Sequence, residues 1–484
     1  MMPLAVPTVT LLPLAPVLVL TATAALLLLL DLLPPRDRKA HLGFVGLGGV
    51  VVMLVVTLSL WGNPRRAFDG MVVLDDYALF FDVTIAFATG LVLLLSLDYL
   101  PRNRAETGEY YALVCFSATG MVLLASAADL ILIFLAVELM SLSLYVLAGF
   151  FSGRLSSSES AMKYFLLGAF ATGFLLYGIA LIYGATGTTN LERIAAATAS
   201  LGRAPLLVIG FALLLVGFGF KISSAPFHMW VPDVYQGAPT SVTALIATGS
   251  KAAALAALLR VLLSALRAAQ PDWVTLVWVA AVLTMTVGNV VAIAQSNLKR
   301  MLAYSAVAHI GYMLVGVVAG GSLGTGGVLF YLLVYTFTTV GAFGVILLLE
   351  RGGQEAVNLA DYAGLATRHP VLALTLSVFL LSLIGIPPTA GFVGKFYLFA
   401  AAIRAGYLWL VVIAVLNSAV AAYYYLRLIV YMYMRDPEGL PTAYAPSLAG
   451  NLALGLAVWG VLQFGVMPAP LFDRARAAVA PLLR

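Results

Sequence analysis

Apolar stretches long enough to cross a lipid bilayer follow one another along almost the whole chain, separated by short polar connections. Only 10% of the 484 residues are charged, whereas soluble proteins carry about 25%. Inside a bilayer every backbone amide must find its hydrogen-bond partner within the protein, and a helix satisfies this condition segment by segment. The sequence therefore predicts an all-α integral membrane protein.

The number of spans follows from their length. Because about 20 apolar residues cross the bilayer as a helix, the chain predicts about fourteen transmembrane helices. Their expected ranges are 8–33, 41–61, 76–99, 110–127, 129–151, 161–185, 204–229, 236–265, 273–294, 300–319, 326–349, 371–402, 406–434 and 447–468. The first stretch lacks the basic region of a signal peptide, so we expect it to remain as the first helix.

The basic residues of the connections predict the orientation, because cytoplasmic loops carry an excess of Lys and Arg. Those after odd-numbered helices are Arg36, Arg38, Lys39, Arg102, Arg104, Arg154, Lys299, Arg300, Arg351, Arg368 and Arg435. Those on the opposite side are fewer: Arg65, Arg66, Arg193, Arg203, Arg260, Arg267 and Arg404. With an even number of helices, we expect both termini on the outer, periplasmic face. The richness in Ala, Leu, Gly and Arg favours a high-GC bacterium, and hence the bacterial inner membrane.

Two parts of the chain resemble each other at an offset of about 166 residues. The matching segments are 165–172 with 331–338, 224–227 with 389–392, and 259–260 with 426–427. Each unit would hold an odd number of helices, so the second copy enters the membrane from the other side, giving two inverted five-helix repeats. The predicted divisions are an N-terminal three-helix segment, the two repeats, and a C-terminal helix with its tail: 1–109, 110–265, 266–434 and 435–484.

Each repeat is expected to contain one broken helix. Proline interrupts the seventh predicted helix at Ser223–Pro226 and the twelfth at Gly385–Pro388. Broken spans at matching places in two halves indicate a transport site. A lysine lies close to each break: Lys221 before the first and Lys395 after the second.

A carboxylate and three lysines stand near the middles of apolar segments: Glu138, Lys221, Lys251 and Lys395. Charges at this depth cost several kcal/mol and usually mark ion or proton pathways. Burial favours the neutral form of each group, whereas pairing keeps both partners charged. Glu138 and Lys221 are therefore predicted to act as a switch, the alternative being a static salt bridge. Lys251 has small neighbours and no carboxylate on its own helix, which favours reversible proton carriage.

Three further residues are candidates for proton translocation. His228 and His309 lie within or beside predicted helices, where imidazole can relay a proton; packed core histidines are the alternative. Lys163 lies near a helix end, where its amine could equally reach the membrane surface. Asp82 and Asp129 are expected at the membrane interface.

Composition excludes most redox sites within this chain. Its one cysteine, Cys115, excludes a disulfide, an Fe–S cluster and a Cys-ligated zinc site. No glycine-rich segment has nucleotide-binding spacing, and the many Tyr and Phe residues are interpreted as ordinary membrane-protein aromatics. Any redox chemistry is therefore expected on another subunit. The dispersed basic residues also argue against nucleic-acid binding.

Four motifs carry a family resemblance: ELMSLSLYVLAG from Glu138, KISSAPFHMWVPDVYQGAP from Lys221, SNLKRMLAYSAVAHIGY from Ser296, and GIPPTAGFVGKFYLF from Gly385. With these motifs the chain resembles the antiporter-like membrane subunits of respiratory complex I, the proton-translocating NADH–quinone oxidoreductase. The resemblance implies a fold of about fourteen transmembrane helices with inverted repeats. It also implies a membrane arm shared with other antiporter-like and small membrane subunits, while NADH, FMN, Fe–S clusters and quinone belong to partner subunits.

The resemblance also assigns roles. It implies that Glu138 is the coupling glutamate, Lys221 its partner, Lys251 the central lysine and Lys395 the terminal one. The two histidines match positions that would link these residues through water. Two features favour the shorter type of subunit in this family: a short C-terminal end without a long lateral helix, and lysine rather than glutamate at position 395. The alternatives are a cation/proton antiporter subunit of a multisubunit exchanger or membrane-bound hydrogenase, and a non-conducting scaffold.

Overall fold

The structure, a computed structural model, describes residues 11–34, 39–105, 107–351, 354–437 and 442–483. Its helices are α1 Ala15–Asp31, α2 Ala40–Ser59, α3 Asp76–Arg102, α4 Gly108–Ser126, α5 Leu130–Ala148, α6 Leu155–Thr186, α7 Leu191–Leu201, α8 Pro205–Ile222, α9 Val231–Gly237, α10 Thr240–Leu245, α11 Lys251–Arg260, α12 Gln270–Ile293, α13 Leu298–Ala319, α14 Gly321–Leu347, α15 Leu365–Arg368, α16 Pro370–Ile384, α17 Ala390–Arg404, α18 Leu408–Met434, α19 Leu448–Val466 and α20 Ala469–Leu483. Its strands are β1 Arg65–Ala67, β2 Val72–Leu74, β3 Leu349–Arg351, β4 Gln354–Glu355 and β5 Ala443–Tyr444.

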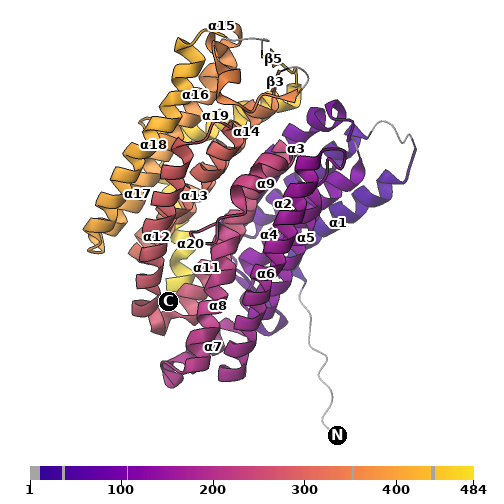
Figure 1. The fold of residues 1–484 in the computed structure, drawn as a ribbon. Helices are drawn as coiled ribbons and strands as arrows, with labels where there is room; N and C mark the ends of the chain where they lie inside the picture. The colour runs from indigo at the N-terminus through magenta and orange to yellow at the C-terminus, as the bar shows by residue number, and fades with distance from the viewer. Residues whose placement is uncertain (1–10, 35–38, 106, 352–353, 438–441, 484) are drawn as a thin grey trace.

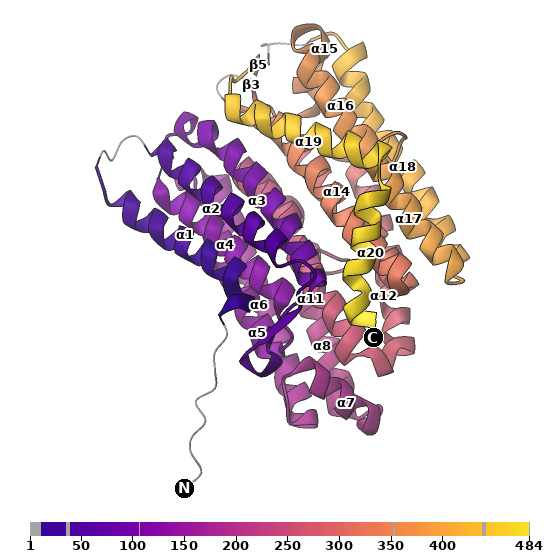
Figure 2. The same ribbon diagram turned by 180° about the vertical axis from the view of Figure 1, so that it is seen from behind.

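Most helices run side by side between two ends of the molecule (Figures 1 and 2). One end carries α7 and is called the α7 end below; the other carries α15 with strands β3 and β5. Within the described residues, thirteen helices are long and apolar enough to cross a membrane. The prediction of an all-α integral membrane protein is therefore confirmed. Residues 8–10 of the first predicted span, and Arg36 and Arg38 of the following loop, lie outside the described residues.

The remaining predicted span, 371–402, is two shorter helices, α16 and α17, and both predicted breaks are present. Helix α8 ends at Ile222, followed by Ser223 at φ 67°, and α16 ends at Ile384, followed by Gly385 at φ 91°. A left-handed residue at this position ends a helix because it turns the chain away from the axis. The relation of the two halves as inverted repeats, and the division of the chain at 109, 265 and 434, remain predictions.

The eighth span, Thr240–Ala265, is almost entirely buried and is not a uniform α-helix. Two π turns interrupt it, at Ile246–Ser250 and at Val261–Ala265, so that α11 lies between them. Such turns are often found at functional sites. They place Lys251 directly after the first π turn.

Four helices were not predicted from the sequence, the short α9 and α15 and the longer α7 and α20. Helix α7 is a short helix at one end of the molecule, and its Leu191 and Ile194 are buried. Helix α20 follows α19 and turns back along α14 and α3 rather than extending sideways (Figure 2). It is held there partly by Phe472, whose ring stacks on that of Tyr397 with the centroids 3.6 Å apart.

Candidate functional site

Lys221 lies in the last turn of α8, at the first break, and reaches towards α5. Its side chain is buried, and Nζ donates hydrogen bonds to Ser141 Oγ at 2.7 Å and Tyr145 OH at 3.3 Å. The Lys221 amine is therefore held by hydroxyl groups of α5.

Glu138 lies one helical turn before Ser141 on the same face of α5. It is half-buried, and its Oε1 is buried without a hydrogen-bond partner among the described residues. No ion pair within 4.0 Å joins Glu138 to Lys221 in the described part of the chain. The structure thus brings the lysine to the face that bears Glu138 but leaves the two charges unpaired.

Lys251 is 1% exposed. Its Nζ donates to the carbonyl oxygen of Ala306 on α13 at 3.2 Å and lies 5.7 Å from the centre of the Tyr235 ring. A carbonyl oxygen and an aromatic face both stabilise an ammonium without adding a negative charge. Lys251 therefore has no anionic partner within ion-pair distance among the residues that the structure describes.

His309 lies on α13, buried between two tyrosines. Nδ1 is 2.7 Å from Tyr331 OH, and Nε2 is 3.2 Å from Tyr425 OH, which in turn contacts Ser305 Oγ. In neutral imidazole one nitrogen donates and the other accepts. Both ring nitrogens are thus hydrogen-bonded in a geometry that suits transfer through the ring.

Lys395 lies on α17 and is aimed at the end of α16, across the second break. Its Nζ donates to the carbonyl oxygens of Leu383 at 3.0 Å and Ile384 at 2.9 Å, and lies 4.5 Å from the centre of the Tyr312 ring. These carbonyls belong to the last turn of α16, where the helix dipole is negative. The amine of Lys395 therefore meets a helix C-terminus, whereas that of Lys221 meets hydroxyl groups.

A polar network that the sequence analysis missed lies between Lys395 and His309. Asn289 donates to Tyr312 OH at 3.0 Å and accepts from Tyr424 OH at 3.0 Å. The Tyr424 ring is 4.3 Å from that of Tyr425, which contacts His309. Interpreting the tyrosines as ordinary aromatics was wrong at these positions. Their signal was the polar residue Asn289 near the C-terminal end of an apolar span.

The other two candidates lie apart from this network. His228 stands in the turn between α8 and α9, half-buried, with Nδ1 lacking a hydrogen-bond partner among the described residues. Lys163 is 40% exposed and pairs with Glu159 and Asp233, each at 2.7 Å. Lys163 is thus at a polar end of α6 and, unlike Lys221, Lys251 and Lys395, is not buried.

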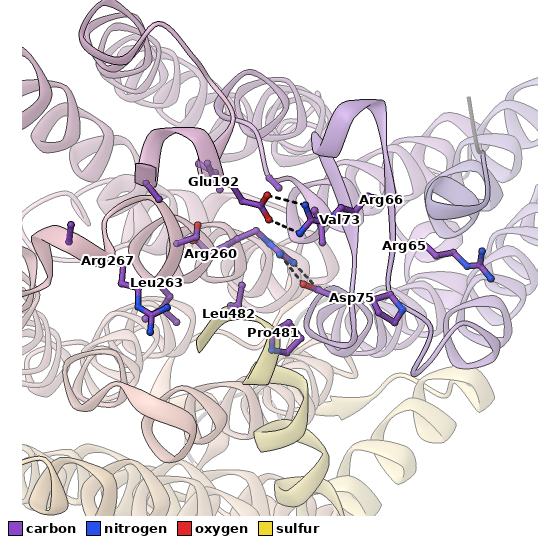
Figure 3. A pocket seen from close by; sticks show the side chains of 16 residues that line it. Arg65, Arg66, Val73, Asp75, Glu192, Arg260, Leu263, Arg267, Pro481 and Leu482 are labelled. Atoms are coloured by element: carbon purple, nitrogen blue, oxygen red, sulfur yellow. Dashed lines mark hydrogen bonds and ion pairs between the residues drawn. The ribbon is translucent and has the colours of Figure 1, made fainter. Parts of the chain in front are cut away.

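The structure also bears on charged residues that were expected outside the middles of the spans. Asp82 is fully buried on α3, seven residues after the N-cap, and Asp129 is the N-cap of α5. Arg260, counted with the connections, is the last residue of α11 and is buried against Asp75 at the α7 end (Figure 3). Asp75 itself caps the N-terminus of α3.

Comparisons with known proteins agree with this fold. Residues 127–421 match the family described as NADH:quinone oxidoreductase/Mrp antiporter, TM. The NADH-quinone oxidoreductase subunit N of Trichlorobacter lovleyi is 49% identical over 96% of each chain. A chain of respiratory complex I from Thermus thermophilus with bound aureothin is 39% identical, with a TM-score of 0.79 over 95% of this chain and 98% of that chain. A chain of the Mrp complex from Dietzia sp. DQ12-45-1b shares the fold, with a TM-score of 0.85 at 22% identity over 98% and 97%. The chain belongs to the NADH:quinone oxidoreductase/Mrp antiporter transmembrane family and, within it, to the N subunits of NADH-quinone oxidoreductase.

Proposed function

We propose that this chain is a proton-translocating membrane subunit of a bacterial NADH–quinone oxidoreductase. Membership of the subunit N family and the likeness to a complex I chain support it. The subunit lies in the inner membrane with both termini on the periplasmic side, next to other antiporter-like and small membrane subunits. NADH, FMN, Fe–S clusters and quinone are bound by partner subunits, and quinone reduction there supplies the energy.

The observation that carries the proposal is the set of buried lysines held by neutral groups. Lys221, Lys251 and Lys395 are each at most 5% exposed, and each bonds to hydroxyl or carbonyl oxygens. A lysine with these partners can lose its proton without leaving a charged partner unpaired in the interior. Such a group is suited to taking up and releasing protons repeatedly.

The order of events follows from the arrangement of the site. When Glu138 moves towards Lys221, the pair keeps both charges, and when it moves away, the lysine is left with hydroxyls alone. That change in charge alters how strongly Lys251 holds its proton. The proton then passes along His309 and its tyrosines to Lys395. His228 lies near the first break, and its Nδ1 has no hydrogen-bond partner in the part of the chain that the structure describes, so it can relay protons through water. Lys163 holds the polar end of α6.

The direct test is Lys251→Ala in the intact complex. We expect loss of proton pumping through this subunit with the complex assembled, measured as protons moved per NADH oxidised in membrane vesicles. Lys251→Arg is the matched variant, because it keeps a positive charge but guanidinium does not release its proton. We expect it to fail in pumping as well. Undiminished pumping in both variants would reject proton carriage through Lys251.

The switch has its own prediction. Glu138→Gln and Lys221→Ala should each depress pumping and the coupled rate of quinone reduction without preventing assembly. Gln keeps the shape of Glu138 but cannot carry its charge, so it separates charge from packing. If either variant assembled and pumped at the wild-type rate, Glu138 and Lys221 would not form a switch.

Lys395→Ala tests the last step of the route, the transfer of the proton to Lys395. Unchanged pumping in this variant would remove that lysine from the route.

Copurification distinguishes this function from the two alternatives. A subunit of NADH–quinone oxidoreductase should purify with flavin- and Fe–S-containing subunits, whereas an exchanger subunit should not. A non-conducting scaffold would purify with them and yet tolerate Lys251→Ala.

A further inference from the structure

Helix α9, Val231–Gly237, stands between the two buried lysines of the first half of the chain. The chain runs from Lys221 at the end of α8 through the first break and α9 to the eighth span, which carries Lys251. Two large side chains of this segment are buried: Trp230, just before α9, is 2% exposed, and Tyr235, on α9, is 0% exposed. Their contacts reach the surroundings of both lysines.

Trp230 is attached to the last turn of α8. Its Nε1 donates to the carbonyl oxygen of Phe220 at 3.2 Å, and its ring stacks on the Phe220 ring with the centroids 5.2 Å apart. Phe220 directly precedes Lys221, whose Nζ lies 5.7 Å from the centre of the Phe220 ring. A shift of this turn therefore displaces the Trp230 ring.

A second series of contacts joins Lys221 to Trp230 through α5 and α6. Lys221 Nζ donates to Tyr145 OH at 3.3 Å and lies 5.5 Å from the centre of the Tyr145 ring. The Tyr145 ring meets the Tyr164 ring edge to face at 4.8 Å, and Tyr164 stacks on Trp230 at 4.6 Å. Trp230 thus contacts the neighbours of Lys221 on three helices, α8 directly and α5 through α6.

On its other side Trp230 contacts Tyr235, with the ring centroids 6.4 Å apart. The Tyr235 ring is the aromatic face beside Lys251, 5.7 Å from its Nζ. Tyr235 OH is buried and has no hydrogen-bond partner in the described part of the chain. The ring is therefore held by its contacts with Trp230 and with Phe343, whose centroid is 6.1 Å away, rather than by its hydroxyl.

The polar side of α9 is fixed to both halves of the chain. Asp233 pairs with Lys163 on α6 and with Arg300 on α13, each at 2.7 Å. These pairs hold α9 in place, while its buried side carries the contacts with the two lysines. Because protein interiors are close-packed, a displacement of one buried ring is passed to the rings that it touches.

We propose that Trp230 and Tyr235 are positioning residues, through which the state of Glu138 and Lys221 is passed to Lys251. The inference rests on the proposed function, because both lysines must act in proton transfer for a link between them to matter. It goes beyond that function in naming a physical connection, whereas a charge on Lys221 could also act on Lys251 directly across the interior.

The link works through the aromatic face beside Lys251. An ammonium is attracted to such a face, and the attraction is stronger where water is excluded. While Lys221 donates to Tyr145, the ring contacts hold Tyr235 against the ammonium of Lys251. When Lys221 turns to Glu138, Tyr145 loses its donor and the rings shift, so the ammonium loses this support and passes its proton towards His309.

The test compares Tyr235→Leu with Tyr235→Phe in the intact complex, as protons moved per NADH oxidised. Both variants lack the hydroxyl, but only phenylalanine keeps the aromatic face. We expect pumping in Tyr235→Leu to fall to the level of Lys251→Ala, and Tyr235→Phe to keep most of it. Wild-type pumping in Tyr235→Leu, or an equal loss in both variants, would overturn the role of the ring.

A double-mutant cycle separates positioning from packing. If Trp230 passes on the state of Glu138, the variant with both Trp230→Leu and Glu138→Gln should pump no less than Glu138→Gln alone. A purely structural role predicts losses that add. Phe81→Leu is the matched control, because Phe81 is 0% exposed and packs on Tyr77 of α3, outside the series of rings between the lysines. We expect any loss that it causes to add to that of Glu138→Gln.

The outcomes separate the two proposals. If Lys251→Ala abolished pumping and Tyr235→Leu did not, the link would be rejected and the proposed function kept. If Lys251→Ala pumped normally, the proposed function itself would be rejected. Should a leucine variant fail to assemble, Trp230→Phe decides, because it keeps a ring but removes the hydrogen bond to the Phe220 carbonyl. We expect it to lower pumping, and wild-type pumping in that variant would overturn the link.

Discussion

Replacing Arg260 by alanine is expected to destabilise the subunit by about 3–5 kcal/mol, which is the usual cost of leaving a buried charge without its partner. Arg260 donates to both carboxylate oxygens of Asp75, at 3.0 and 2.9 Å, and both side chains are 4% exposed. Without the guanidinium, Asp75 remains buried at the start of α3 with no ion-pair partner within 4.0 Å among the described residues. The measurement is the amount of assembled complex in the membrane and the temperature at which it loses activity.

Arg66→Ala is the matched control. Arg66 also makes a two-point pair, with Glu192 at 2.9 and 2.6 Å, but those side chains are 58% and 61% exposed. Exposed pairs contribute about 0–1 kcal/mol, so we expect normal assembly. Asp75→Asn combined with Arg260→Met removes both charges and should recover much of the loss. An equal loss of assembly in Arg66→Ala and Arg260→Ala would show that burial is not the cause.

Gly391→Ala is expected to be the most disruptive change of a single methyl group near the site. A Cβ at position 391 would overlap the carbonyl oxygen of Ser382 on α16, and backbone cannot rotate away as a side chain can. Overpacking of this kind costs about 1–3 kcal/mol, sometimes more. Because Lys395 lies one turn further on the same face, moving α17 outward also separates its Nζ from the α16 carbonyls. Both thermal stability and proton pumping should fall.

Gly173→Ala provides the comparison. Gly173 lies in the middle of α6, is exposed, and has no atom within 4 Å of its would-be Cβ. Alanine favours a helix over glycine by about 1 kcal/mol, so this variant should be neutral or slightly stabilised. Equal behaviour of the two variants would mean that α16 and α17 are not in close contact at position 391.

The long helices were predictable because their length and hydropathy are local properties. The breaks were predictable for a similar reason, since Pro226 and Pro388 interrupt apolar stretches. Helix α20 was not, because its burial depends on the surfaces of α14 and α3, which the sequence does not place in space. The π turn before Lys251 was also missed, since it shifts the helical pattern by less than a turn within a uniformly apolar segment.

The candidate site was likewise predictable only in part. Isolated charges such as Lys251 and Lys395 stood out from their apolar surroundings. Their partners did not, because the carbonyl oxygens of Ala306 and Ile384 are present in any sequence and only the fold selects them. The burial of Asp82 was not predicted because it depends on which helices pack around α3, and the sequence does not place them in space.

The carbonyl and hydroxyl partners of the three lysines also bear on which ion can be carried. A neutral amine is a good base for a proton, whereas hard metal cations prefer oxygen ligands, usually six or more for a large one. Lys395 offers one nitrogen, and the oxygens of Leu383, Ile384 and Ser418 beside it are already occupied by that amine. A sodium ion would have to displace the lysine to gain its own coordination shell. A relay built on such lysines distinguishes protons from sodium by the bond each ion forms, and needs no pore of selective diameter.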